Sequence, residues 1–378
     1  MVISFSASCR SYGTCPHGGK RRARVGNQGK TLYEHLMGKR LIRDLFNSKG
    51  VLLIAAATVL DAGHADILED NGMILTVRDV EEVGHDGRMS VVLLNRNLDE
   101  AIAVVKGLFD HIRITRQIPL AEIRTRVIPV IRQSAERLHL FQLFTMLQVK
   151  HDYIYRHSVA VGAVSMLLGK WLRLSEAELL QLTTAAVLHD IGKTQIPLEL
   201  LNKPERLSDD EFDTMKRHTL IGFEMIRKTV GTTQRQASVA LQHHERIDGS
   251  GYPFGLRDDK IDLFSRIVAV ADVFHAMTSK TVYRDPSPMY EVLKQLESGA
   301  YGMFDPVVVT LLIQKFMQAL IGYEVMLTDG TRAKIVLIHP HHQTRPLVQA
   351  GDRFIDLSKE YSVHIERVFP SDDGEQAR

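Results

Sequence analysis

Histidines and aspartates recur at a nearly regular interval through the middle of this 378-residue chain. The recurring positions are His157, His189-Asp190, His218, His243-His244 and Asp272. Successive groups are roughly 25 to 32 residues apart, about the length of one helix, a loop and a further helical turn. One such group on each of several packed helices would reach the same level of a bundle, so the spacing predicts a helical bundle with a polar centre.

Residues 148–318 carry the helical pattern that such a bundle needs. Three of its segments open with an N-terminal capping signal: Ser175 with Glu178, Ser208 with Glu211, and Asp305 followed by Pro306. Helices of this length joined by short loops predict an antiparallel arrangement.

The segment before this block predicts two further units. Residues 31–95 alternate in short strand-like runs, with a hairpin turn at Asn47 to Gly50 and a short helix that ends at Gly72. The runs "MILTV" and "MSVVLL" predict further strands, so we expect a small β-rich regulatory domain. Residues 96–147 change to a helical period, which Pro129 should bend or interrupt, and they predict a helical linker.

The segment after the block returns to strand-like alternation. Asp329-Gly330 is expected at the turn of a hairpin, and "RFIDL" and "SVHIERVF" predict two more strands. We therefore expect a small β-hairpin domain over residues 319–370 and a polar tail over residues 371–378. The whole chain is predicted to be mainly α, with an antiparallel helical bundle flanked by small β-rich N- and C-terminal segments.

The distribution of charge limits the partners to expect. The formal net charge is 47 − 45 = +2, but residues 1–30 hold six basic side chains and no acidic one, so the remainder carries 41 − 45 = −4. The body of the chain is thus mildly acidic and gives no reason to expect a nucleic acid polymer as partner. Residues 1–30 are basic and rich in Gly and Ser, and they predict a disordered leader.

The same leader bears on location. It lacks the apolar core of a secretory signal, and it holds the only cysteines, Cys9 and Cys15, which we interpret as free thiols of a reducing compartment. The longest apolar run, Val51 to Leu60, is far shorter than the roughly 20 residues that a membrane span needs. We expect no membrane span and a cytoplasmic location.

The recurring side chains have the chemistry of metal ligands. Five imidazoles and two carboxylates converging in one bundle fit two borderline divalent ions such as iron, manganese or zinc, whereas magnesium or calcium would prefer more oxygen ligands. A histidine on an apolar helix face is more often a satisfied core or surface residue than a ligand. Several other histidines are interpreted in that way, namely His139, His151, His275 and the turn His339 to His342.

Five motifs in the helical block resemble, in order and spacing, those of the HD-GYP family, a branch of the HD-domain metal-dependent phosphohydrolases. The motifs are "YRHSVAVG", "LHDIGKTQIP", "MKRHTLIG", "HHERIDGSGYP" and "VAVADVFHAMTS". The resemblance covers about residues 148–318, under half of the chain. It implies that this block is an HD-type antiparallel helical bundle.

The resemblance also implies a centre of two divalent metal ions, iron or manganese, with zinc as a further candidate. The ligands implied for one ion are His157, His189, Asp190 and Asp272. The ligands implied for the other are Asp190, as a bridge, with His218, His243 and His244. Some members with three metals have a glutamate where this chain has Tyr153, so we expect two.

The activity implied is hydrolysis of the bacterial second messenger cyclic di-GMP to the linear dinucleotide pGpG, and in some members on to GMP. The catalytic assignments are Asp190 and Lys193, the lysine being placed to reach a phosphate oxygen. The substrate contacts assigned are Lys193, Gly251, Tyr252, Lys280 and Arg284, although Tyr252 could equally be a structural plug. The family also suggests contacts with GGDEF-domain proteins, and the linker helices could support a homodimer.

The chain departs from the family after Asp272. The family commonly reads D-x-x-D-A-x-T-S-D-R-P-Y-R, and this chain reads "DVFHAMTSKTVYR". His275 and Lys280 each replace an aspartate, and Thr281 replaces an arginine that helps to hold the substrate phosphate. Arginine grips phosphate through two hydrogen bonds and threonine cannot, so Lys280 and Arg284 would have to compensate as point charges.

Three hypotheses of function therefore stay open. The first is a cyclic di-GMP phosphodiesterase with regulatory flanks. The second is a hydrolase of the same type that acts on another cyclic dinucleotide or nucleotide. The third is a module that binds metal and nucleotide without useful turnover, and the complete set of predicted metal ligands argues against it.

Overall fold

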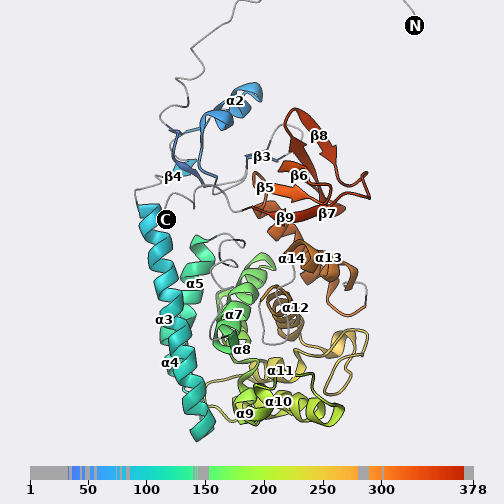
Figure 1. The fold of residues 1–378 in the computed structure, drawn as a ribbon. Helices are drawn as coiled ribbons and strands as arrows, with labels where there is room; N and C mark the ends of the chain where they lie inside the picture. The colour runs from blue at the N-terminus through green and yellow to red at the C-terminus, as the bar shows by residue number, and fades with distance from the viewer. Residues whose placement is uncertain are drawn as a thin grey trace, which may run out of the picture. The chain divides into compact units, whose positions relative to one another are not determined.

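The computed structural model describes residues 33–81 with short gaps, and then residues 86–138, 141, 143, 153–279, 289–299 and 302–369. The chain divides into two compact units between Val91 and Val92. Figure 1 shows the elements of each unit. The predicted leader and tail, and the predicted turn at residues 47–50, lie outside the described residues.

The first unit holds short strands and one helix around a small apolar core. Its elements are β1 (Arg40–Leu41), β2 (Leu45–Phe46), β3 (Leu52–Ile54), α2 (Ala62–Asp70) and β4 (Val80–Glu81). Strand β2 pairs antiparallel with β3, on either side of the predicted hairpin turn, and β1 pairs antiparallel with β4. The short helix is confirmed: Asp61 caps its first turn, and Gly72 follows its end with φ +60°.

Two strands predicted for this unit are wrong. "MSVVLL" (Met89 to Leu94) lies inside the long helix α3 (Asp86–Thr115). Its last residue, Leu94, is the first of four buried residues at helical spacing, followed by Leu98, Ile102 and Val105. A short apolar run does not distinguish helix from strand, and here the residues that follow it decide.

In "MILTV" (Met73 to Val77) none of the described residues is in a strand. There the Asp79 carboxylate accepts hydrogen bonds from both the amide and the hydroxyl of Thr76, at 2.9 Å each, which forms a turn in place of a strand.

The second unit is built mainly from helices, which confirms the predicted fold class. In chain order they are α3, which crosses from the first unit, α4 (Leu120–Glu122), the π-helical turn η2 (Ile123–Val127), α5 (Ile128–Arg137), α7 (Tyr153–Trp171), α8 (Glu176–Leu188), η3 (Ile191–Gln195), α9 (Leu198–Leu201), α10 (Asp209–Arg227), α11 (Gln234–Gln242), η4 (Asp258–Lys260), α12 (Leu263–Thr278), α13 (Met289–Gly299) and α14 (Pro306–Ala319). The interruption expected at Pro129 is the change from η2 to α5, whose first turn contains this proline. Helix α7 packs against α8 and against α12, and α10 packs against η3 and against α11, beside which it lies in Figure 1.

All three predicted helix starts are present. Ser175 opens α8 and Ser208 opens α10, each in a reciprocal capping box with the glutamate three residues later. The Asp305 carboxylate caps α14 by accepting from the amides of Val307 and Val308. These caps supply partners for amides that a helix cannot satisfy by itself, so each helix begins at a defined residue.

The second unit ends in a five-stranded antiparallel sheet of order β8-β7-β6-β5-β9. Its strands are β5 (Glu324–Leu327), β6 (Arg332–His339), β7 (His342–Ala350), β8 (Arg353–Asp356) and β9 (Ile365–Val368). The predicted hairpin at Asp329-Gly330 and the last two strands are confirmed. Buried residues of the sheet, such as Val325 and Ile335, belong to the same apolar core as Phe316 of α14.

Strand β7 was not predicted, although it is an interior strand that pairs with β6 and β8. It contains Pro346, which has no amide hydrogen and normally argues against a central strand. The structure accommodates it because the register between β6 and β7 shifts on either side of Leu337, close to this proline, and its carbonyl still accepts from the Leu357 amide. His339 to His342 forms the tight turn before β7, as expected.

Among the helices described here, none combines the length and the apolar character that crossing a bilayer requires.

Replacing Asp305 by alanine is expected to lower the melting temperature more than replacing it by asparagine. Asp305 caps α14 and also accepts from Arg266, 3.2 Å away, and asparagine keeps the capping oxygen while losing the ion pair. Loss of such a cap costs about 0.5–2 kcal/mol. Thermal unfolding followed by circular dichroism measures the difference, and equal melting temperatures for the two variants would show that the cap contributes nothing.

Candidate metal centre

The recurring histidines and aspartates come from five helices of the second unit. His157 lies in the first turns of α7, His218 in the middle of α10 and Asp272 in α12, whereas the two pairs stand where α8 and α11 end. His189 is the C-terminal cap of α8, and His243 is that of α11. Neighbours within a helix point about 100° apart, but the chain leaves the helix at each pair, so both members can face one site.

The structure brings all seven predicted side chains together in two adjoining groups. The donor atoms within each group lie no more than 4.8 Å from one another. The first group is His157, His189 and Asp272; the second is Asp190, His218, His243 and His244. This division matches the two ligand sets expected from the sequence, with Asp190 placed in the second.

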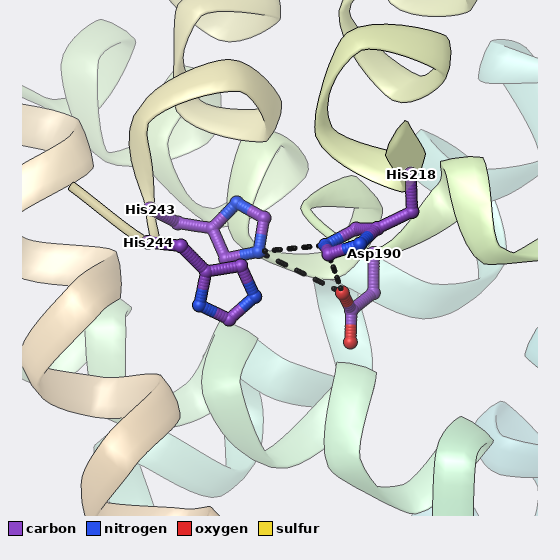
Figure 2. Close-up of side chains that lie close together, drawn as sticks. All are labelled: Asp190, His218, His243 and His244. Carbon is purple, nitrogen blue, oxygen red and sulfur yellow. Dashed lines mark hydrogen bonds and ion pairs between the residues drawn. The ribbon is translucent and has the colours of Figure 1, made fainter. Parts of the chain in front are cut away.

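Asp190 faces both groups. Its Oδ2 lies 3.3 Å from Nε2 of His189, while its Oδ1 lies 3.4 Å from Nε2 of His218 and 3.7 Å from Nε2 of His243. Figure 2 shows the rings of His218 and His243 and this carboxylate turned toward one another. One carboxylate with an oxygen directed at each group is the arrangement of a ligand that bridges two cations.

Backbone carbonyls fix the tautomer of three imidazoles. Nδ1 of His189 lies 2.7 Å from the Ala186 carbonyl, and Nδ1 of His218 lies 2.7 Å from that of Met215. In the same way, Nδ1 of His243 is 3.0 Å from the Ala240 carbonyl. A carbonyl oxygen only accepts, so each Nδ1 carries the proton, and each Nε2 presents its lone pair to the centre.

Several buried atoms of the centre are left without a compensating partner. Within the described part of the chain, Nε2 of His189 and Oδ1 of Asp190 have no hydrogen-bond partner. Nε2 of His218 and Nε2 of His243 approach to 3.4 Å, although the carbonyl contacts leave both as acceptors. An unsatisfied buried polar group costs about 1–3 kcal/mol, and divalent cations would satisfy all of these atoms at once. The donor set therefore fits the expected metals.

The electrostatics keep most of the centre in the protonation state that binds metal; at His189 burial acts to lower the pKa, but the Asp190 carboxylate raises it. Burial by itself would raise the pKa of Asp190, but the ammonium of Lys193, 2.6 Å away, and the His189 ring hold it well below its usual value. Burial lowers the pKa of His218 to about 3, and it also lowers those of His243 and His244. Ionised carboxylates and neutral imidazoles are the forms that coordinate a cation.

Gly192, between the aspartate and the lysine of "HDIGK", is required for close packing. A Cβ on this residue would lie 1.9 Å from the His218 carbonyl oxygen and 2.7 Å from the Gly222 amide nitrogen, and both are backbone atoms. The glycine thus allows η3, which follows Asp190, to approach the turn of α10 that carries His218.

The loop after the paired histidines supports one of them. Tyr252 stacks on His244 with ring centroids 4.6 Å apart, and the Glu245 carboxylate accepts from the amides of Phe254 and Leu256. At Gly251 a Cβ would lie 2.4 Å from the Arg246 amide nitrogen, so the loop folds back on the residues that precede it. The role of Glu245 as the anchor of this loop was not predicted, because a buried acid gives no distinctive local pattern.

The remaining predicted site residues divide into two kinds. Lys193 is placed at the centre, where it donates to Asp190, and its predicted contact with a phosphate stays a prediction. Lys280, Thr281 and Arg284 lie outside the described residues, as do His139 and His151. His275, interpreted from the sequence as an ordinary core or surface histidine, is buried, and its contact with His157 was missed.

Comparison with known proteins agrees with these features. Residues 142–308 match the model of the HD domain. A cyclic di-GMP phosphodiesterase of Thermotoga maritima is 39% identical over 180 residues, covering 46% of this chain and 49% of that protein. The cyclic di-GMP phosphodiesterase PA4108 of Pseudomonas aeruginosa is 32% identical over 249 residues, covering 66% of this chain and 60% of that protein.

A third relative carries a different substrate in its name. The 3'3'-cGAMP-specific phosphodiesterase 1 of Vibrio cholerae is 33% identical over 174 residues, covering 46% of this chain and 40% of that protein. The chain thus spans about half the length of these curated relatives.

Replacing Gly192 by alanine is expected to lower the melting temperature by several degrees, because its Cβ would meet backbone atoms of α10. Gly107 of α3 is the matched control, since a Cβ there meets nothing within 4 Å and alanine favours a helix interior by about 0.5–1 kcal/mol. Thermal unfolding of both variants measures the contrast. A Gly192→Ala protein as stable as Gly107→Ala would contradict the close approach.

The metal-free protein is expected to lose stability as the pH falls from about 7 toward 4. The pKa values of His218, His243 and His244 are lower in the folded protein than the usual value of about 6.5, so the unfolded chain binds more protons in this window. The raised pKa of His189 acts in the opposite direction, but it is a single group. The measurement is the melting temperature in the presence of a chelator across this range.

A His218→Asn variant should show a smaller loss over the same pH range, because one of the three buried imidazoles is gone. His341→Gln, at an exposed position, is the control that should keep the wild-type pH dependence. The same slope in wild type and His218→Asn would contradict the prediction.

Proposed function

We propose that the HD domain of residues 142–308 is a two-metal phosphodiesterase that hydrolyses cyclic di-GMP to the linear dinucleotide pGpG, with GMP as the product of a second cleavage. The observation that carries the proposal is the pair of buried ligand groups that face one shared carboxylate, Asp190. The names of the Thermotoga maritima and Pseudomonas aeruginosa relatives support the choice of substrate.

The residues proposed to hold the two ions are the seven of the two groups. His157, His189 and Asp272 would hold one, His218, His243 and His244 the other, and Asp190 would bridge them. Nitrogen and oxygen donors in this mixture favour iron or manganese and also accept zinc. Two bound ions would neutralise the negative charge of the phosphodiester and lower the pKa of the water that attacks phosphorus.

The side chains of the centre are not equally buried, and the difference indicates where the substrate would approach. His189, Asp190, His218 and His243 are at most 3% exposed. The exposed fraction rises to 11% at Asp272, 19% at His244 and 27% at Lys193. A phosphodiester would therefore reach the centre from the side of these three residues.

Lys193 and the loop that follows His244 border this accessible side. The ammonium of Lys193 already lies at a carboxylate of the centre, where it would add positive charge beside the phosphate in the transition state. The stacking of Tyr252 on His244 favours a supporting role for this ring, with Gly251 allowing the loop to pass close by. Lys280 and Arg284 are proposed as further phosphate contacts from the segment after α12.

We also propose a cytoplasmic location for the enzyme, a regulatory role for the β-rich residues 31–95, and contacts with GGDEF-domain proteins. We further propose that two copies of the chain form a homodimer through the helices of residues 96–147.

A second candidate substrate is another cyclic dinucleotide. Two observations favour it: the match to a Vibrio cholerae phosphodiesterase named as specific for 3'3'-cGAMP, and the replacement of the expected arginine by Thr281. The ligand groups would be the same for either substrate, so the segment around Thr281 would decide between them.

Purified protein reconstituted anaerobically with Fe(II) or Mn(II) is expected to convert cyclic di-GMP to linear dinucleotide or GMP, identified by chromatography. A His189→Ala/Asp190→Ala double variant should fall to background, because it removes a ligand from one group and the carboxylate that faces both. Asp210→Asn, an exposed acid in the first turn of α10, is the matched control and should keep full turnover.

No turnover of cyclic di-GMP by a protein that holds both ions would overturn the proposed substrate. Turnover of 3'3'-cGAMP in the same assay would then support the second candidate, whereas no turnover of either would support a binding module.

A further inference from the structure

The His157 ring lies between two other polar side chains. Its Nε2 faces Oδ1 of Asp272 at 3.1 Å, and its Nδ1 faces Nδ1 of His275 at 3.0 Å. His275 follows Asp272 by three residues on α12, so one face of this helix contacts both nitrogens of a ring carried by α7. All three side chains are buried.

The Nδ1 contact of His157 differs from those of the other ligand histidines. Nδ1 of His189, His218 and His243 each face a backbone carbonyl, which can only accept. Nδ1 of His157 faces an imidazole nitrogen, which donates or accepts according to its tautomer. Two ring nitrogens at 3.0 Å attract each other only when one of them carries a proton, and two neutral rings achieve this with complementary tautomers.

Ser279 allows His275 to supply either tautomer. Its hydroxyl lies 3.3 Å from Nε2 and 3.4 Å from Nδ1 of His275, and a hydroxyl both donates and accepts. With the proton of His275 on Nε2, directed at Ser279, its Nδ1 accepts from Nδ1–H of His157. The Nε2 lone pair of His157 is then directed at Asp272 and the centre.

With the proton of His275 on Nδ1, the opposite arrangement results. Nδ1 of His157 accepts, and its Nε2–H donates to the Asp272 carboxylate, an arrangement that satisfies both groups but blocks Nε2 as a ligand. In both arrangements each ring carries one proton. The change from one to the other therefore moves protons between ring nitrogens without changing the net charge of the pair.

We propose that His275 is a positioning residue that sets the tautomer of His157. By accepting from Nδ1–H of His157, it makes Nε2 available as a metal ligand, and so it raises the affinity of the ion that His157, His189 and Asp272 would hold. This inference rests on the proposed two-metal function. Hydrogen bonds to the distal nitrogen of a ligand histidine typically change metal affinity by about 10–100-fold.

The surrounding packing holds the two rings in register. Tyr153 stacks on His157 with centroids 5.5 Å apart and lies nearly parallel to His275 at 6.4 Å. Tyr153 thus limits how far either ring can tilt, so the identity of residue 275 acts on His157 mainly through the hydrogen bond.

The test is the Mn(II) affinity of the full chain, measured under anaerobic conditions by electron paramagnetic resonance of the free ion. His275→Phe keeps a planar ring but removes the acceptor, and we expect it to weaken one of the two bound ions about 10–100-fold while leaving the other unchanged. His275→Asp restores an acceptor for Nδ1–H of His157 and should bind that ion at least as tightly as the wild type. Melting temperatures of the metal-free variants control for folding.

If His275→Phe and His275→Asp weaken Mn(II) binding equally, His275 acts only through packing and the proposal is overturned. Wild-type Mn(II) affinity in His275→Phe would also overturn it. If His275→Phe does not fold, nitrogen NMR of the histidine rings in the wild-type protein decides instead. Loaded with Zn(II), His157 should carry its proton on Nδ1, and a proton on Nε2 would overturn the proposal. Tight metal binding without turnover would contradict the proposed function alone, whereas a wild type that binds no Mn(II) would overturn both.

Discussion

The carboxylate of Asp190 is the charge on which the architecture of the second unit depends. It is almost fully buried where five helices meet, and an ionised carboxylate there is very costly unless positive charge compensates it. Lys193 provides part of that charge from one side. Burial keeps the His218 and His243 imidazoles neutral, and the carbonyl contacts at Nδ1 direct their Nε2 lone pairs at the centre, so these rings add lone pairs and not charge. A buried anion surrounded by lone pairs fits cations, and the five helices α7, α8, α10, α11 and α12 supply the side chains that surround it.

Two features of the backbone make this convergence possible. Helices α8 and α11 end at the centre, which frees adjacent residues to point in one direction. Gly192 removes the side chain that would keep η3 away from α10, and Gly251 does the same where the loop after His244 folds back. The capped start of α8 lies at its far end, so this helix is fixed in length between Ser175 and the centre.

The sequence alone was sufficient for the helical bundle, its capped starts and the seven converging side chains. These features repeat a strong local pattern or match family motifs residue by residue. It failed where the outcome depends on neighbours that are distant in the chain. "MSVVLL" became helical because it continues into the stripe that begins at Leu94, and β7 formed despite Pro346 because strands on both sides pair with it. The contact between His275 and His157 spans two helices, so no spacing along the chain could reveal it.

The central claim is that two cations share one carboxylate at this centre. Anomalous diffraction at the manganese edge, from crystals of the full chain grown with Mn(II), tests it most directly. We expect two peaks, one among His157, His189 and Asp272 and the other among His218, His243 and His244, with Asp190 between them. A single peak, or peaks away from Asp190, would contradict it.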